Sequence, residues 1–126
     1  MRLLVDTHVL LWWLADDDRL PEGPRDAVNT AQEVRLSTAS VWEIAIKRKI
    51  GRLQVPEHYL EAVDAGEIDL LPITAQHAEI AGALPRHHDD PFDRMLVAQA
   101  KTDDLTLVTA DRRLTEYDVP VLLARQ

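Results

Sequence analysis

Short apolar runs alternate with amphipathic segments along the chain. The runs that predict buried or edge strands span residues 2–5, 33–37, 68–71, 105–109 and 119–123. The segments with helical spacing span residues 7–14, 21–32, 38–50, 56–65 and 74–84, with another from 91 onward and a short one from 111. Parallel strands need crossover helices between them. The alternation therefore predicts an α/β fold with a central, mostly parallel sheet of about five strands and helices on both faces.

The segment from residue 87 to 100 carries the clearest helix-start signal in the chain. An Asp90 side chain can accept hydrogen bonds from the first turn, and Pro91 at the first helical position loses nothing. Asp93 then lies in that first turn, where the helix dipole favours a negative charge. We expect the buried face of this helix to consist of Leu96, Val97 and Ala100.

The length of 126 residues is that of one ordinary domain, so we expect a single domain over residues 1–126. The chain has no cysteine, which excludes disulfides and thiolate zinc sites and favours a reducing compartment such as the cytoplasm. Its longest apolar run, 9–15, is too short to span a bilayer, and no export-signal pattern is visible. We therefore expect no membrane association.

The formal net charge is −8, from 22 acidic residues against 14 lysines and arginines. A nucleic-acid-binding protein is usually basic overall, so this balance counts against nucleic acid as a partner. A carboxylate cluster that holds a divalent metal nevertheless needs several acids, and the bound ion reduces their charge. The composition is thus compatible with a metal-dependent enzyme.

Four acidic residues from separate segments are predicted to meet at one edge of the sheet. Asp6 and Asp111 follow predicted strands, whereas Glu43 and Asp93 lie near the N-termini of helices that begin on the same edge. Carboxylates that converge in this way repel one another unless a hard cation lies between them. Oxygen ligands suit magnesium or manganese and exclude a typical zinc site. Taken singly, each acid could instead cap a helix or, for Glu43, pair with Lys47.

Other residues near these acids admit simpler roles. For His87 and His88 we expect a loop role or a contact with a substrate phosphate rather than metal ligation. Thr7 or Thr109 could orient a ligand or a water molecule, or simply close a turn. The run 9–14 is too apolar for a surface helix, so it packs on two sides or forms part of a dimer face. We expect the three tryptophans, Trp12, Trp13 and Trp42, to pack rather than to stack on bases.

The order of these motifs resembles that of the PIN-domain ribonucleases, specifically the VapC toxins of bacterial toxin–antitoxin pairs. The resemblance covers nearly the whole chain and is carried by residues 3–8, 37–44, 87–100 and 109–112, among which the Asp-Pro-Phe-Asp-Arg run is the most specific. It implies a three-layer α/β/α PIN-like domain. It also implies that four acids bind one or two Mg²⁺ or Mn²⁺ ions: Asp6, Glu43, Asp93 and Asp111. Asp90 is then a neighbour of this site that caps a helix.

The resemblance further implies endonucleolytic cleavage of RNA, inhibition of translation, neutralisation by a cognate VapB-like antitoxin, and a homodimer. Metal-assisted hydrolysis of a phosphodiester needs no protein nucleophile. The sequence leaves three alternatives open: a non-catalytic PIN-fold binding module, a nuclease that acts on DNA, and a phospho-acceptor receiver domain. The last is disfavoured because Thr7, not a second acid, follows Asp6, and no lysine follows Lys101.

Overall fold

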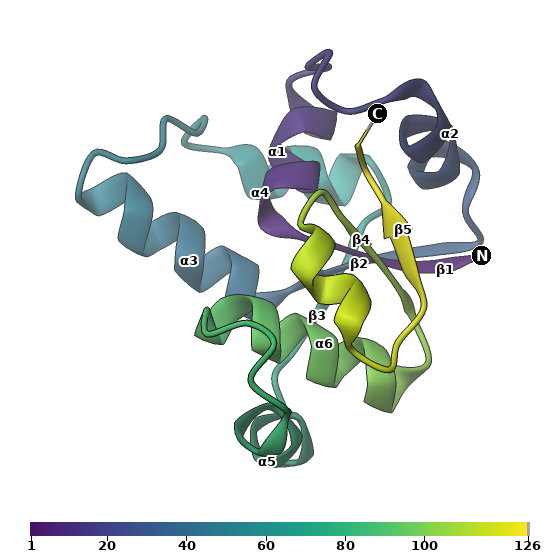
Figure 1. Cartoon of the computed structure of the whole chain (residues 1–126). Helices are drawn as coiled ribbons and strands as arrows, with labels where there is room; N and C mark the ends of the chain where they lie inside the picture. The colour runs from purple at the N-terminus through teal and green to yellow at the C-terminus, as the bar shows by residue number, and fades with distance from the viewer. Residues whose placement is uncertain (126) are drawn as a thin grey trace.

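The computed structural model describes residues 1–125. Its strands are β1 (Arg2–Val5), β2 (Glu33–Ser37), β3 (Asp69–Leu71), β4 (Thr106–Thr109) and β5 (Val121–Leu123). Its α-helices are α1 (Thr7–Leu14), α2 (Glu22–Thr30), α3 (Thr38–Lys49), α4 (Tyr59–Ala65), α5 (Ala75–Ala83) and α6 (Pro91–Asp103). A 3₁₀ helix, η1 (Arg112–Glu116), follows β4. Figure 1 shows their arrangement.

The five strands form one sheet in the order β3-β2-β1-β4-β5, and every neighbouring pair is parallel. The predicted parallel sheet is thus confirmed. The chain adds β2 and β3 on one side of β1 and β4 and β5 on the other side. The carboxyl ends of β1 and β4 therefore flank the point where the strand order reverses, which is the usual position of a ligand site in open α/β sheets.

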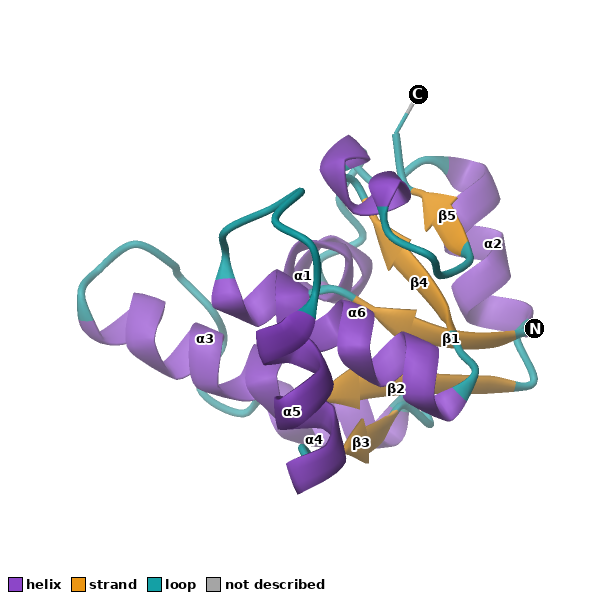
Figure 2. Ribbon diagram, turned by 60° about the horizontal axis from the view of Figure 1, so that its bottom comes forward, coloured by secondary structure: helices purple, strands orange, loops and turns teal. Residues whose placement is uncertain are grey.

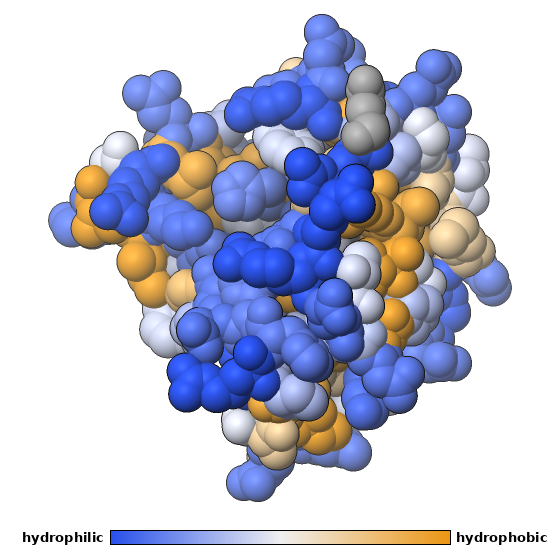
Figure 3. Space-filling view, in the orientation of Figure 1, coloured by the Kyte–Doolittle hydropathy of each residue, from blue (hydrophilic) through white to orange (hydrophobic). Residues whose placement is uncertain are grey.

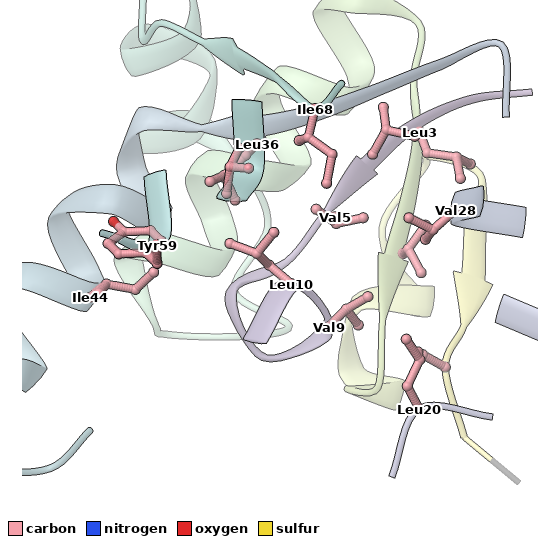
Figure 4. Packing of buried hydrophobic residues seen from close by; sticks show 14 residues of the cluster. Leu3, Val5, Val9, Leu10, Leu20, Val28, Leu36, Ile44, Tyr59 and Ile68 are labelled. Carbon is pink, nitrogen blue, oxygen red and sulfur yellow. The ribbon is translucent and has the colours of Figure 1, made fainter. Parts of the chain in front are cut away.

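Helices cover both faces of the sheet, as expected from the strand pattern (Figure 2). Alternate residues of β1 point to opposite faces, so Leu3 and Val5 join one buried cluster and Leu4 joins the other. The first cluster lies under α1, α2 and α4 and is seen from close by in Figure 4. The second lies under α6 and includes Leu96, Val97 and Ala100, as predicted.

Short polar side chains set the helix starts that face the carboxyl edge of the sheet. Asp6 accepts from the backbone N–H of Val9 at 2.8 Å, and Asp90 accepts from that of Phe92 at 2.8 Å. Ser37 accepts from the N–H of Ala39 at 2.9 Å. These caps satisfy N–H groups that have no partner within the helix. They also bring α1, α3 and α6 to begin at the same edge.

Several helices and strands are shorter in the structure than the sequence predicted. The helix expected from residue 56 begins at Tyr59, because residues 56–58 form a turn closed by the Tyr59 N–H on the Pro56 carbonyl. The edge strand expected over 119–123 is ordered as a strand only over Val121–Leu123, since Pro120 has no N–H to donate. None of the helices over residues 1–125 combines the length and apolarity that a membrane crossing requires.

The apolar run at 9–14 is covered largely by the chain itself. Val9 and Leu10 are fully buried, and the four residues after them are partly buried against the same cluster. Packing within the chain thus accounts for the apolarity of Val9 and Leu10, and the role of this run in a dimer face stays a prediction. Of the three tryptophans expected to pack, Trp12 and Trp13 lie against this cluster, whereas Trp42 is 62% exposed and touches Phe92 edge to face.

Candidate active site

The four acids expected to converge line a single cavity of about 400 Å³ at the carboxyl edge of the sheet. Asp6 comes from the end of β1, Glu43 from the second turn of α3, Asp93 from the first turn of α6, and Asp111 from the start of η1. Asp90 also lines the cavity, and Thr7 lies in its wall. On the face that Figure 1 turns toward the viewer, hydrophilic side chains predominate across the middle of the molecule (Figure 3).

Asp6 is buried at the carboxyl edge of the sheet, with 7% of its surface exposed. Burial raises the pKa of its carboxyl above the ordinary value, while the Thr109 hydroxyl and the Val9 N–H stabilise the charged form and oppose the rise. Thr109 is itself fully buried, and its oxygen also accepts from the Asp111 N–H at 3.1 Å. One threonine thus ties together two of the acids.

Glu43 is buried and held at both carboxylate oxygens. Thr7 donates its hydroxyl to Oε1 at 2.6 Å, and the Lys47 Nζ lies 2.6 Å from Oε2. Lys47 is one helical turn beyond Glu43 and lines the cavity as well. The pairing with Lys47 that the sequence allowed is therefore present. It coexists with the placement of Glu43 at the cavity.

Among the acids of the cavity, Asp93 has a strongly raised pKa. Burial, followed by the negative charges of Asp90, Asp6, Glu43 and Asp111, raises the pKa of its carboxyl to about 7. Burial and the repulsion of the neighbouring carboxylates thus make the charged form of Asp93 costly, so this acid holds its proton near neutral pH. A cation placed among them would remove that cost.

The pKa of Asp111 is shifted in the opposite direction. The Arg113 guanidinium lies 2.8 Å from Oδ2 and 3.0 Å from Oδ1, and these contacts lower the pKa of Asp111 to about 2 against the effect of burial. The Arg113 backbone N–H also donates to Oδ1 at 3.0 Å, so Asp111 caps η1. The carboxyl of Asp111 is therefore ionised throughout the physiological range.

His88, for which the sequence predicted a loop role or a contact with a substrate phosphate, lines the cavity and contacts two of the acids. Its Nε2 is 2.9 Å from Asp111 Oδ2 and 3.1 Å from Asp93 Oδ2, and only 7% of the residue is exposed. Its Nδ1 accepts the Asp90 backbone N–H at 3.0 Å, so the ring hydrogen is on Nε2. Nε2 therefore donates to the two carboxylates.

This tautomer bears on the metal site. His88, Asp93 and Asp111 each offer an atom within 4.8 Å of the others, a spacing suited to one ion. A ring nitrogen that carries a hydrogen has no lone pair for a metal. His88 therefore holds the two carboxylates through its Nε2–H. The carboxylate oxygens of the four acids that line the cavity are donors of the kind that magnesium or manganese prefers.

The loop before α6 is held in place by two side chains. The Arg94 guanidinium donates to the carbonyls of Ala81 and Leu84 at 2.9 Å each, and to that of Pro85 at 3.1 Å. The Tyr117 hydroxyl donates to the Pro85 carbonyl at 2.9 Å and accepts the His88 N–H at 3.1 Å. These anchors fix the backbone that carries His88 into the cluster.

A sequence comparison with known families matches residues 3–120 to the PIN domain. A curated relative, Ribonuclease VapC22 of Mycobacterium tuberculosis, is 33% identical over 121 residues, which cover 94% of this chain and 93% of the relative.

Solved structures share the fold at low sequence identity. A crystal structure of VapBC2 from Rickettsia felis bound to a promoter DNA fragment superposes with a TM-score of 0.72 at 11% identity, covering 98% of both chains. A toxin–antitoxin complex from Klebsiella pneumoniae has the same TM-score and coverage at 16% identity. These likenesses show that the chain shares its three-layer fold with chains of the two solved complexes.

Proposed function

Because this chain belongs to the PIN-domain family, we propose that it is a VapC-type toxin, a metal-dependent endoribonuclease that cleaves RNA phosphodiester bonds and thereby inhibits translation. The observation that carries the proposal is the convergence of Asp6, Glu43, Asp93 and Asp111 on one cavity. The name of the relative that is 33% identical, a ribonuclease, supports RNA as the substrate.

We assign the binding of Mg²⁺ or Mn²⁺ to the same four carboxylates: Asp6, Glu43, Asp93 and Asp111. A divalent ion bound there would supply positive charge to the phosphate and make water more acidic. The proton that Asp93 holds near neutral pH must leave before its carboxylate can act as a ligand. Thr7 and Lys47 hold the Glu43 carboxylate in one orientation.

The remaining polar residues of the cavity provide positioning and charge. His88 orients Asp93 and Asp111 through its Nε2–H. Lys47 and Arg113 bring two positive charges to the cavity, where they can contact the oxygens of a phosphate. The attacking group is water, so no nucleophilic side chain is required.

The proposal is tested by incubating total cellular RNA with the purified protein and with Asp93→Asn, each with Mg²⁺, with Mn²⁺ and with excess EDTA. Asp89→Asn is a matched control, because this acid lies four residues before Asp93 in the sequence but has a side chain that is 78% exposed, outside the cavity and paired with Arg86. Discrete fragments from the wild type and from Asp89→Asn, absent with Asp93→Asn or EDTA, are expected.

Two results would contradict the proposed RNA cleavage. Identical behaviour of the wild type and Asp93→Asn would favour the non-catalytic binding module. Cleavage of single- or double-stranded DNA in a parallel arm, with RNA left intact, would assign the nuclease to DNA.

The same family membership leads us to propose a VapB-like antitoxin as partner, a homodimer, and action in the cytoplasm. The solved neighbours named as VapBC or toxin–antitoxin complexes support the partner. Expression of the chain should arrest bacterial growth, and co-expression of a small reading frame next to its gene should relieve the arrest. Arrest that persists with Asp93→Asn would contradict a nucleolytic cause. Sedimentation at micromolar concentration distinguishes a dimer from a monomer.

A further inference from the structure

The wall of the cavity next to α1 carries aromatic rings that metal binding does not use. His8 and Trp12 both line the cavity, four residues apart on the helix that Asp6 caps. Residues at this spacing lie on one face of a helix, and the two rings are 6.2 Å apart between centroids. The third ring in the lining belongs to His88, whose two nitrogens are already bonded to Asp90 and to the acids.

Trp13, the next residue along α1, is a packed tryptophan with which Trp12 can be compared. Trp13 lies against Gly66, and its N–H donates to the Asn29 side chain at 2.9 Å. Trp12 instead divides its ring between the core cluster and the cavity. The Arg19 guanidinium, which does not line the cavity, lies 5.5 Å from the Trp12 ring centroid and contacts this ring through a cation–π interaction.

From this placement we propose that Trp12, with His8, forms a nucleobase subsite that stacks on a base of the RNA strand next to the scissile phosphate. The inference rests on the proposed nuclease function and deepens it. Carboxylates, cations and a metal act on phosphate, which is the same in every nucleotide. Aromatic side chains contact bases, and stacking on them is the usual way in which single strands are held.

The position of Trp12 selects a nearby nucleotide. It lies six residues beyond Asp6, about 9 Å along the helix axis. A strand with its phosphate at the acids therefore brings an adjacent base, not a distant one, to the indole. Trp12 is on this basis a positioning and specificity residue, and it takes no part in bond cleavage.

Two readouts test the subsite in the intact protein. The first maps the ends of fragments cut from total RNA by the wild type, Trp12→Phe and Trp12→Ala. The second measures the affinity of a single-stranded RNA oligonucleotide of mixed sequence, and of the same backbone with abasic positions, in the Asp93→Asn background so that the RNA stays intact. Trp42→Ala is the matched control, since it removes an exposed tryptophan that does not line the cavity.

We expect Trp12→Ala to weaken RNA binding about tenfold, as the loss of one base–aromatic stack does. The base preference at one position beside the cut should weaken with it. Trp12→Phe should retain most of the RNA affinity and most of the base preference, and Trp42→Ala should change neither quantity. Abasic RNA should bind the wild type and Trp12→Ala equally. Because Trp12 also packs on the core, His8→Ala provides a second variant at an exposed residue, expected to weaken binding to a smaller extent.

Two results overturn the inference. One is a folded Trp12→Ala protein, verified by its thermal unfolding, that binds RNA and chooses cut sites as the wild type does. If Trp12→Ala does not fold, unchanged affinity of His8→Ala for the mixed-sequence RNA has the same meaning. A wild type that cuts no RNA would instead refute the proposed function, and the affinities would still decide whether Trp12 binds a base.

Discussion

The imidazole of His88 and the carboxylate of Asp111 are joined by a contact of 2.9 Å between Nε2 and Oδ2, across 23 residues of sequence. The same nitrogen lies 3.1 Å from Asp93. A side chain from the loop before α6 thereby links an acid of α6 to an acid that follows β4. The geometry of the acidic cluster depends on this loop as much as on the strands.

His88→Ala should lower the rate of RNA cleavage by about 10–100-fold, the usual cost of removing a group that orients metal ligands. The measurement is single-turnover cleavage at saturating Mn²⁺. His87→Ala is the control, because this neighbouring ring is exposed and packs on Tyr117 instead of the acids. Equal activity of the two variants would show that His88 does not organise the site.

The stability of the metal-free protein should depend on Asp93 between about pH 4 and pH 7. Its pKa is about 7 in the folded protein against 3.8 as the ordinary value, so over this range the unfolded chain binds fewer protons than the native state at this residue. The contribution of Asp93 to the free energy of unfolding therefore falls as the pH rises.

Asp93→Asn should accordingly be more stable than the wild type at pH 7 in EDTA, by on the order of 1–3 kcal/mol, and nearly equal to it at pH 4. Urea unfolding of both proteins at the two pH values measures this. A stability difference that is the same at pH 4 and pH 7 would mean that the Asp93 carboxyl is not perturbed.

Metal affinity should rise with pH for the same reason. While Asp93 is protonated, binding of Mn²⁺ must release its proton, so affinity should increase about tenfold per pH unit up to about pH 7 and then level off. Calorimetric titration in buffers of different ionisation enthalpy reports both the affinity and the proton released. Affinity that is constant from pH 5.5 to pH 7.5, with no proton released, would mean that Asp93 is already ionised before the metal binds.

Arg94→Ala should destabilise the fold by on the order of 2 kcal/mol, because it leaves the Ala81, Leu84 and Pro85 carbonyls without their charged donor. It should also slow cleavage, since the loop that carries His88 loses its anchor. Arg86→Ala, which removes an arginine that is 81% exposed in the same loop, should do neither. Chemical denaturation and RNA cleavage assays on the two variants separate these outcomes.

Gly66→Ala should destabilise the protein by about 1–3 kcal/mol, the usual cost of overpacking. A Cβ at this position would lie 2.6 Å from the Trp13 ring, which is held by its hydrogen bond to Asn29. Gly82→Ala is the converse case, since a Cβ there meets nothing within 4 Å and alanine favours the α5 helix by about 1 kcal/mol. Thermal unfolding that showed the same shift for both variants would contradict this packing of α1 against α4.

Local patterns in the sequence determined most of the architecture. Apolar runs and helix caps are readable from residues close together, which is why the strands, the parallel sheet and the start of α6 at Pro91 were predicted. Strand ends and helix starts that share one edge were also enough to place Asp6, Glu43, Asp93 and Asp111 at one cavity. The helix caps and the site were not alternatives, because Asp6 and Asp111 do both.

Only the tertiary structure decided how these groups interact. The orientation of His88 depends on a loop held by Arg94 and Tyr117, and the pKa of Asp93 depends on burial among charges from three other segments. Trp12 and Trp13 are neighbours in one apolar run, yet one lines the cavity and the other packs on Gly66. Such contacts join residues far apart in sequence, so the spacing of residues along the chain does not predict them.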